Sequence, residues 1–217
     1  RSGFESRLPC DGVGKPWSVA MRLDKPCVVM YLNVLSHEEC DRLIALSRPK
    51  LKISTTIDNK TGEAKAHEHR SSQGTFFKLR ENDFIREIDE RLADIMKLPI
   101  ENSEGLQILN YQVGGEYRPH FDYFPPEHPG SSLHIEKGGQ RVATLILYLN
   151  DVEAGGETIL PEVSLKIAPL KGAALYFSYF HQGKVDPMTL HGGCPVVAGE
   201  KWIATKWVRE SNYNKPE

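Results

Sequence analysis

Apolar runs and helical spacings divide the N-terminal half of the chain into a few elements. The segment Arg1–Lys25 is polar and interrupted by Gly and Pro, and the apolar run Pro26–Leu35 follows it, which predicts an arm and then a strand. Ser36 and Glu39 have the spacing of a capping box, so a short amphipathic helix is expected to begin there. A second helix is predicted over Asp83–Leu98, where apolar residues recur on one stripe and a proline ends the pattern.

The stretch between the two predicted helices has a different character. Leu51–Ile57 and Ser72–Leu79 have the composition of strands. Asp58–His69, by contrast, is rich in charged residues and has almost no apolar side chain, so it cannot contribute to a core. We expect this segment to form a mobile surface loop.

From Gly105 onward, short β-rich runs alternate with turns that contain Gly and Pro. The runs are Leu106–Val113, Arg141–Asn150, Ser164–Ala168, Ala173–Phe180 and Trp202–Arg209. Many short strands with turn signals every ~8 to 12 residues favour a sandwich or barrel over a parallel sheet with crossover helices. The pattern therefore predicts an α+β fold with a jelly-roll β core and supporting N-terminal helices.

The length of 217 residues and the ordinary globular composition suggest one folded domain. We expect an N-terminal arm over residues 1–25 and a single domain over residues 26–217. Within that domain, residues 26–104 would form a support of helices and strands, and residues 105–210 would form the jelly-roll core.

The charge balance excludes some classes of partner. Lys and Arg number 27 and Asp and Glu number 29, which gives a net charge of −2, and the two signs are interleaved. A nucleic-acid-binding protein normally concentrates basic residues, so no nucleic-acid partner is expected. The longest apolar runs, such as Ala143–Leu149, are far shorter than the roughly 20 residues of a membrane-spanning helix, so no membrane partner is expected either.

The spacing of the cysteines bears on the redox state of the protein. Cys10, Cys27, Cys40 and Cys194 are widely separated, and none of them forms a C-x-x-C pair. This pattern does not suit a disulfide scaffold, so reduced thiols are the simpler interpretation. Whether any two of the four form a disulfide stays open.

His120 and Asp122 are the first candidates for chemistry. Alternate residues of a strand point to the same face, so the two side chains could bind one ion. The pair alone is weak evidence for a metal site, because a histidine at a strand edge beside a solvated aspartate gives the same pattern. Four aromatic residues lie within three positions of the pair, and they would exclude water and hold the side chains in fixed rotamers. Two His and one carboxylate form the facial triad of non-haem Fe(II) oxygenases, so a third ligand is needed from a distant strand.

The remaining histidines differ in how well they could supply that ligand. His191 precedes two glycines in a β-rich region, where the backbone can approach closely, and it is the preferred third ligand. His181 follows an apolar strand but starts a polar turn. The others are expected at the surface: His37, His67, His69, His128 and His134.

Lys201 stands immediately before the predicted strand that starts at Trp202. A lysine in this position is ordinarily a solvated strand end. If the side chain instead points into a pocket, its ammonium group could bind a carboxylate. An acidic cosubstrate would then offset the cost of burying the charge.

Several motifs occur together and in order over roughly Val28–Arg209. They are Leu109-Asn110-Tyr111, Tyr117-Arg118-Pro119-His120-Phe121-Asp122-Tyr123, Gln140-Arg141-Val142-Ala143-Thr144, Tyr148-Leu149-Asn150-Asp151-Val152, Gly155-Gly156-Glu157-Thr158, Lys171-Gly172-Ala173-Ala174-Leu175, Leu190-His191-Gly192-Gly193-Cys194-Pro195 and Gly199-Glu200-Lys201-Trp202. In these motifs the sequence resembles the collagen-type prolyl 4-hydroxylases, members of the Fe(II)- and 2-oxoglutarate-dependent dioxygenase superfamily. The resemblance implies a double-stranded β-helix, which is the jelly-roll fold of that superfamily.

The resemblance also implies a role for each matching residue. The iron ligands would be His120, Asp122 and His191. The residues that bind 2-oxoglutarate would be Lys201, on the distal carboxylate, with Tyr111 and Thr158. The residues that shape the peptide-proline site would be Tyr117, Arg141 and Trp207, although core aromatics and a strand-end cation would give the same pattern. The charged segment Ile57–Arg70 resembles the family's substrate-covering loop.

The implied activity is peptidyl-proline 4-hydroxylation, coupled to the oxidative decarboxylation of 2-oxoglutarate to succinate and CO2. The cosubstrates would be 2-oxoglutarate and O2. The metal would be Fe(II), and the reductant would be ascorbate. The partner would be a proline-containing peptide or protein. The near-neutral charge of the chain suits a weakly charged partner of this kind. Two alternatives stay open: an oxygenase that acts on another side chain or a free amino acid, and an inactive module that binds proline-rich peptides.

The sequence departs from the animal members of this family at Cys194. In those members the matching cysteine pairs with one nearer the C-terminus, whereas no cysteine follows Cys194 here. The departure favours a compact enzyme of microbial type in the cytoplasm, with the lumen of the endoplasmic reticulum as the alternative. The pattern defines neither the physiological peptide nor the oligomeric state.

Overall fold

The computed structural model describes residues 9–215, except 55, 58–63, 66–70, 126, 129 and 182–183. The loop expected at Asp58–His69 and the covering segment Ile57–Arg70 therefore lie outside the described residues, apart from two short strands. These strands are β4 (Thr56–Ile57) and β5 (Ala64–Lys65), which pair with each other.

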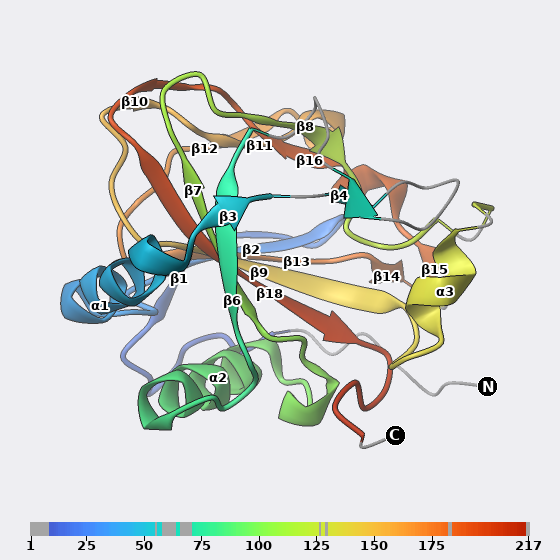
Figure 1. Ribbon diagram of the computed structural model, residues 1–217. Coiled ribbons are helices and arrows are strands. Elements are labelled where there is room, and N and C mark those ends of the chain that lie inside the picture. Colours follow the sequence, from blue (N-terminus) through green and yellow to red (C-terminus); the bar gives the residue numbers. More distant parts are fainter. Residues whose placement is uncertain are drawn as a thin grey trace.

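Two β-sheets make up most of the structure (Figure 1). In spatial order, the eight-stranded large sheet contains β1 (Ser18–Leu23), β2 (Cys27–Leu32), β13 (Ala174–Ser178), β9 (Arg141–Tyr148), β18 (Lys201–Arg209), β7 (Leu106–Tyr111), β6 (Gln73–Phe77) and β3 (Lys52–Ile53). The four-stranded small sheet contains β12 (Leu165–Ile167), β11 (Thr158–Leu160), β16 (His191–Gly193) and β8 (Tyr117–His120). Further two-stranded pairs are β10 (Ala154–Gly155) with β17 (Val196–Ala198) and β14 (Phe180–His181) with β15 (Lys184–Val185). Every strand pairing within the described residues is antiparallel.

The two longer helices flank the large sheet, and each begins at a side-chain cap. The helices are α1 (His37–Ser47), α2 (Asp83–Met96) and the short α3 (Ser131–Ile135), with 3-10 turns at Arg48–Lys50, Ile100–Asn102, Pro161–Val163 and Pro187–Thr189. The capping box of α1 is confirmed, because Ser36 and Glu39 each accept a hydrogen bond from the other's backbone N–H. Helix α2 ends at Met96 rather than at Leu98, because Lys97 adopts a left-handed conformation (φ 54°). In addition, Leu98 precedes Pro99, and the helical conformation is unfavourable for a residue before a proline.

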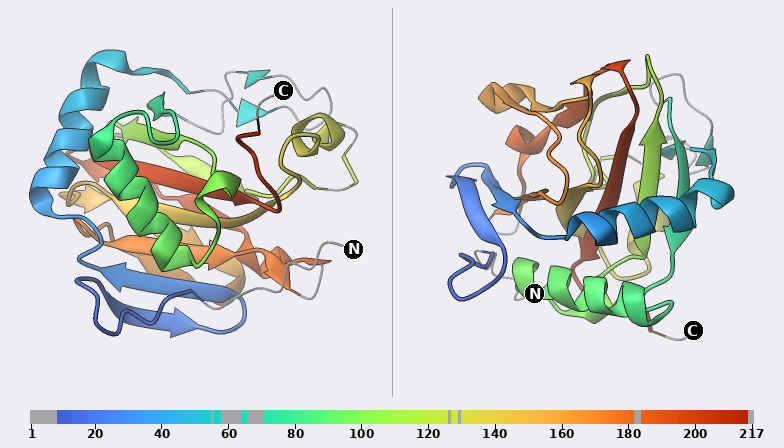
Figure 2. Two further views of the ribbon diagram at one scale, coloured as in Figure 1. Left: turned by 90° about the horizontal axis from the view of Figure 1, so that it is seen from below. Right: turned by 90° about the vertical axis from the view of Figure 1, so that its left-hand side faces the viewer.

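The two faces of the large sheet pack against different layers. Successive side chains of a strand point to opposite faces, so each strand contributes to both layers. On β2, Val29 and Tyr31 pack in one core with α1 and α2, while Val28 and Met30 pack in a second core that includes residues of the small sheet. Figures 1 and 2 show the two longer helices on one side of the large sheet and the small sheet on the other. The second core therefore forms between the two sheets.

The α+β fold with a jelly-roll core is confirmed. Its large sheet combines strands from the N-terminal and C-terminal halves of the chain. Strand β2 lies between β1 and β13, and β6 pairs with β7, so strands from before and after residue 104 share the large sheet. Within the expected arm, Ser18–Leu23 form the edge strand β1, in which half-buried residues alternate with exposed ones. This period of two was the overlooked strand signal in the N-terminal segment.

Candidate active site

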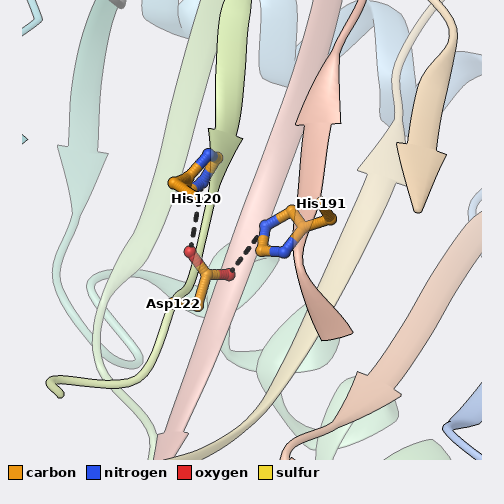
Figure 3. A group of neighbouring side chains, drawn as sticks. All are labelled: His120, Asp122 and His191. Carbon is orange, nitrogen blue, oxygen red and sulfur yellow. Dashed lines mark ion pairs between the residues drawn. The ribbon is translucent and has the colours of Figure 1, made fainter. Parts of the chain in front are cut away.

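His120, Asp122 and His191 come together at the small sheet (Figure 3). Strand β8 ends at His120, Asp122 follows two residues later, and β16 begins at His191, directly opposite His120 in the ladder. His120 Nε2 lies 3.5 Å from Asp122 Oδ1, and His191 Nε2 lies 3.5 Å from Asp122 Oδ2. One possible ligand atom from each residue lies within 4.8 Å of the others. The structure thus places the H-x-D pair beside the preferred third histidine.

The backbone sets which nitrogen of each imidazole faces Asp122. His120 Nδ1 lies 2.8 Å from the Arg118 carbonyl oxygen, and His191 Nδ1 lies 3.0 Å from the Thr189 carbonyl oxygen. A carbonyl oxygen only accepts, so each Nδ1 carries a proton and donates it. In the neutral ring, Nε2 then has the free lone pair that a metal requires.

Burial and mutual charge set the protonation of the three side chains. Burial favours a higher pKa for Asp122, but the charge of His191 and hydrogen bonds from both imidazoles outweigh it and hold that pKa well below its ordinary value. Burial likewise opposes charge on His191, but the Asp122 carboxylate outweighs this effect and raises the His191 pKa. The pKa of His120 is lowered, first by burial and then by the charge of His191. An ionised carboxylate between two imidazoles is an arrangement that suits a cation.

This donor set fits Fe(II). Two imidazole nitrogens and a carboxylate oxygen converge, and His191 and Asp122 are only 4% and 8% exposed. Two His and one carboxylate are the facial triad of Fe(II) oxygenases, in which further coordination positions stay open for cosubstrates. The residues of the site are therefore chemically suited to this metal.

A pocket beside the three side chains is lined by residues from both sheets. The lining includes most of the other predicted site residues, namely Tyr111, Tyr117, Thr158, Lys201 and Trp207. Tyr111 and Lys201 are directly opposite each other on β7 and β18. Thr158 starts β11, and its hydroxyl accepts a hydrogen bond of 2.8 Å from the buried Tyr148 hydroxyl. Residues far apart in sequence thus meet in one cavity.

Lys201 is a buried cation in this pocket. Its side chain is buried, with the residue 4% exposed, and its Nζ lies 5.7 Å from the centroid of the Tyr111 ring. Burial lowers the pKa of Lys201 to about 8, against the smaller opposing effects of Cys194 and Glu157. Within the described part of the chain, no carboxylate lies within ion-pair distance of this ammonium. The site can therefore accept a carboxylate from a ligand.

The three residues predicted for the proline site have different environments. Tyr117 stacks on His120, with ring centroids 3.5 Å apart and an interplanar angle of 19°. Trp207 lines the pocket, and the guanidinium of Arg141 lies 3.9 Å from its ring centroid. Arg141 itself is outside the pocket lining and donates two hydrogen bonds to Glu104, of 2.7 and 3.0 Å. Arg141 thus supports the Trp207 wall from behind.

The other histidines do not join the site as far as they are described. His37 is exposed, and His128 and His134 are half-buried, with His134 stacked on Phe124. His67, His69 and the side chain of His181 lie outside the described residues.

Sequence reasoning missed two buried polar residues that contact the site. Thr144 on β9 donates a hydrogen bond of 2.7 Å to Asp122 Oδ2, and the hydroxyl of Tyr179 contacts the same Thr144 oxygen. A usable signal existed in the strand Arg141–Tyr148, where Thr144 is the one hydroxyl among consecutive apolar residues between Val142 and Leu147. A buried polar group usually has a partner, and here the partner is Asp122.

An antiparallel jelly roll with two His, one Asp and a buried Lys around one pocket defines the class of 2-oxoglutarate- and Fe(II)-dependent oxygenases. In agreement, residues 106–209 match the family model described as the 2OG-Fe(II) oxygenase superfamily. The chain is also similar to the solved 2OG complex of a viral collagen prolyl hydroxylase from Paramecium Bursaria Chlorella virus-1. That similarity has a TM-score of 0.64 and 29% identity, and it covers 91% of this chain and 98% of the viral one.

Comparison with curated relatives narrows the class. The chain is 40% identical to prolyl 4-hydroxylase 5 of Arabidopsis thaliana, over 91% of this chain and 72% of the relative. It is 39% identical to probable prolyl 4-hydroxylase 8 of the same plant, over 94% of this chain and 75% of the relative. The chain therefore belongs to the prolyl 4-hydroxylase family.

Family membership confirms the reaction class expected from the motifs. The protein is a dioxygenase of the proline-hydroxylating type that uses Fe(II), 2-oxoglutarate and O2. Ascorbate as reductant and hydroxyproline as product are consistent with the family. The comparisons favour neither a different acceptor nor an inactive binding module.

Among the helices of the described residues, none has the length and apolar character needed to cross a membrane.

Proposed function

We propose that the protein hydroxylates ring carbon 4 of proline residues within peptides, with His120, Asp122 and His191 holding Fe(II). When bound, Fe(II) supplies the redox chemistry that couples O2 to the decarboxylation of 2-oxoglutarate and to oxygen insertion. The observation that carries the proposal is one pocket that contains both the facial set of donors and the buried Lys201 ammonium.

Lys201, Tyr111 and Thr158 bind 2-oxoglutarate in this proposal. The Lys201 ammonium pairs with the distal carboxylate, which offsets the cost of keeping a cation buried. Tyr111 lies opposite Lys201 in the ladder and can donate its hydroxyl to the same group. Thr158 accepts from Tyr148, so its own hydroxyl proton is free to point toward the ligand.

The proline ring binds against aromatic side chains that line the pocket. Tyr117 and Trp207 provide these surfaces, and Arg141 holds the Trp207 ring through the cation–π contact while Glu104 fixes the guanidinium. Proline-rich peptides are already extended, so they lose little conformational entropy on docking against aromatic side chains. The acceptor is therefore a proline-containing peptide or protein.

The residues of the pocket act by position, not as nucleophiles. Leu109, Ile146 and Ile203 form apolar walls on the large sheet that limit the access of water. Lys201 orients the cosubstrate from one side, and the two imidazoles with Asp122 define the opposite side. Reaction specificity then follows from which ring carbon the aromatic surfaces present.

The direct test is an assay with Fe(II), 2-oxoglutarate, O2, ascorbate and a panel of collagen-like, polyproline and other proline-containing peptides. We expect succinate in step with a peptide heavier by one oxygen atom, and 4-hydroxyproline after hydrolysis of that peptide. Succinate without oxygen in the peptide, or oxygen on a residue other than proline, would contradict the proposal. The His120→Ala variant serves as the inactive control.

We also propose that a single catalytic domain corresponds to residues 26–217, extended by β1. Support comes from the large sheet, which joins strands from the whole length of the chain. Limited proteolysis should leave one resistant fragment that retains Ser18–Leu23. Two separately stable fragments would contradict a single domain.

For the compartment, we propose the reducing cytoplasm over the secretory lumen. All four cysteines are free in the structure, and Cys10 and Cys40 are buried. Free thiols of this kind are typical of reducing compartments. Alkylation of freshly isolated protein should modify four thiols after denaturation, whereas a disulfide found by mass spectrometry would argue for the lumen.

A further inference from the structure

Besides the two imidazoles, Asp122 has a buried hydroxyl as a partner. Thr144 lies in the central strand β9, is fully buried, and donates to Asp122 Oδ2 over 2.7 Å. Tyr179 follows β13 directly, is also fully buried, and places its hydroxyl on the Thr144 oxygen. The reaction proposed above uses neither hydroxyl.

The chemistry of the groups fixes the direction of these hydrogen bonds. An ionised carboxylate only accepts, so the Thr144 proton points to Asp122. The Thr144 oxygen is then the acceptor for Tyr179, whose phenol keeps its proton because burial, aided by the charge of Asp122, raises its pKa well above the ordinary value. Two hydrogen bonds in series polarise and strengthen one another.

This arrangement distinguishes the two oxygens of Asp122. Each oxygen lies 3.5 Å from one imidazole Nε2, but only Oδ2 accepts a hydrogen bond from Thr144, and Oδ1 has no hydroxyl partner among the described residues. A carboxylate engaged by a hydrogen bond on one oxygen offers the other to a cation. Binding through a single oxygen also leaves more coordination positions for cosubstrates.

We propose that Thr144 and Tyr179 are positioning residues of the iron site, holding Asp122 in one orientation and leaving Oδ1 for the metal. The inference rests on the proposed function, because it takes Asp122 as an iron ligand. Thr144 is well placed for such a role, since it pairs with Phe177 across two central strands of the large sheet, and Tyr179 follows directly after one of these strands. Side chains fixed by rigid elements hold a ligand more closely than loop residues do.

The test measures metal binding without turnover. Metal-free protein is titrated with Co(II) by calorimetry in the absence of 2-oxoglutarate, and the absorption bands of bound Co(II) are recorded. Thr144→Val keeps the side-chain shape but removes the hydroxyl, and we expect it to weaken Co(II) binding by about 10- to 100-fold and to change the bands. Thr144→Ser, which retains the hydroxyl, should restore most of the affinity.

Tyr179 acts through Thr144 in this inference, so the effects of the two substitutions on Co(II) affinity should not be additive. Tyr179→Phe alone should weaken Co(II) binding less than Thr144→Val does. The double variant should bind no more weakly than Thr144→Val. The matched control is Tyr176→Phe, because Tyr176 is a buried tyrosine of β13 in the helix-side core and should leave Co(II) affinity unchanged.

The outcomes separate this inference from the function on which it rests. Wild-type protein that binds Co(II), together with a folded Thr144→Val variant of equal affinity, would overturn the positioning role and leave the function intact. Equal losses in Thr144→Ser and Thr144→Val would overturn it too. If Thr144→Val does not fold, Tyr179→Phe decides, and wild-type affinity there refutes the role. Wild-type protein that does not bind Co(II) would refute both.

Discussion

His120 and His191 show how main-chain contacts can prepare a site for a metal. His120 Nδ1 donates to the Arg118 carbonyl oxygen, and His191 Nδ1 donates to the Thr189 carbonyl oxygen. These contacts direct each Nε2 toward Asp122, and because the acceptors are main-chain groups, no side-chain substitution removes them. The carboxylate between the two imidazoles is in turn held by Thr144. At the scale of single residues, the site is therefore ordered by its surroundings before a cation enters.

Replacing one imidazole should separate activity from folding. His191→Ala removes one of three proposed ligands, and we expect product formation to fall by at least about 10³-fold, since two donors do not hold the metal in place. Removing His191 also removes a charge partner of Asp122, so a small shift in stability is expected. Succinate release and the circular dichroism of the metal-free protein measure the two effects. An active variant would refute His191 as a ligand.

Lys201 should give the reaction a pH limit. Burial lowers its pKa to about 8, so the free enzyme has the ammonium below that pH and loses it above. In the proposed function the ammonium form binds the carboxylate, so kcat/KM for 2-oxoglutarate should fall as the pH rises through about 8. Initial rates at limiting 2-oxoglutarate measure this. Lys201→Ala should have a low and flat profile over the same range, and an unchanged fall in that variant would assign the titration to another group.

Strand β18 connects the site to the helices because its side chains alternate. Lys201, Ile203 and Trp207 line the pocket, whereas the intervening Lys206 points to the helix side. Lys206 is fully buried, and its Nζ lies 2.7 Å from Oδ1 of Asp89 on α2. Asp89 also accepts from the Arg80 backbone N–H over 2.8 Å. One ion pair thus connects the strand that carries Lys201 to α2.

Breaking this ion pair from one side should destabilise the protein strongly. Asp89→Ala leaves the Lys206 charge buried without its partner, and we expect a loss of about 3–5 kcal/mol in the free energy of unfolding. Adding Lys206→Met removes the stranded charge, so the double variant should regain part of that loss. Urea denaturation of the wild type, Asp89→Ala, Lys206→Met and the double variant measures the coupling. Strictly additive effects would show that the pair contributes no specific coupling.

The sequence predicted elements better than it predicted their pairing. Each of the five β-rich runs contains an observed strand, namely β7, β9, β12, β13 and β18, because period and turn residues are local signals. The insertion of β2 between β1 and β13 joins segments far apart in the chain, which no local pattern encodes. The same limit applies within the site. His120 and Asp122 share a motif, but the contact of Thr144 with Tyr179 exists only once two strands are adjacent.

Charge at the scale of the whole molecule bears on how the peptide arrives. The net charge of −2 is small, and the cation of the pocket is buried, so long-range attraction contributes little to the encounter. We therefore expect the KM for an uncharged proline-rich peptide to change by less than about 2-fold between roughly 50 and 500 mM NaCl. Initial rates with saturating 2-oxoglutarate measure it. A steep salt dependence would reveal a charged peptide site.

The site has one half on each sheet: His120 and His191 lie on the small sheet, and Lys201 lies on the large sheet. A metal on the first half and a dicarboxylate that reaches the second half would bridge the same gap. Each ligand then favours the spacing of the sheets that the other needs, so their binding is linked. By reciprocity, the metal should tighten 2-oxoglutarate binding by the same factor by which 2-oxoglutarate tightens the metal. The distance between two sheets thus becomes a thermodynamic variable shared by both ligands.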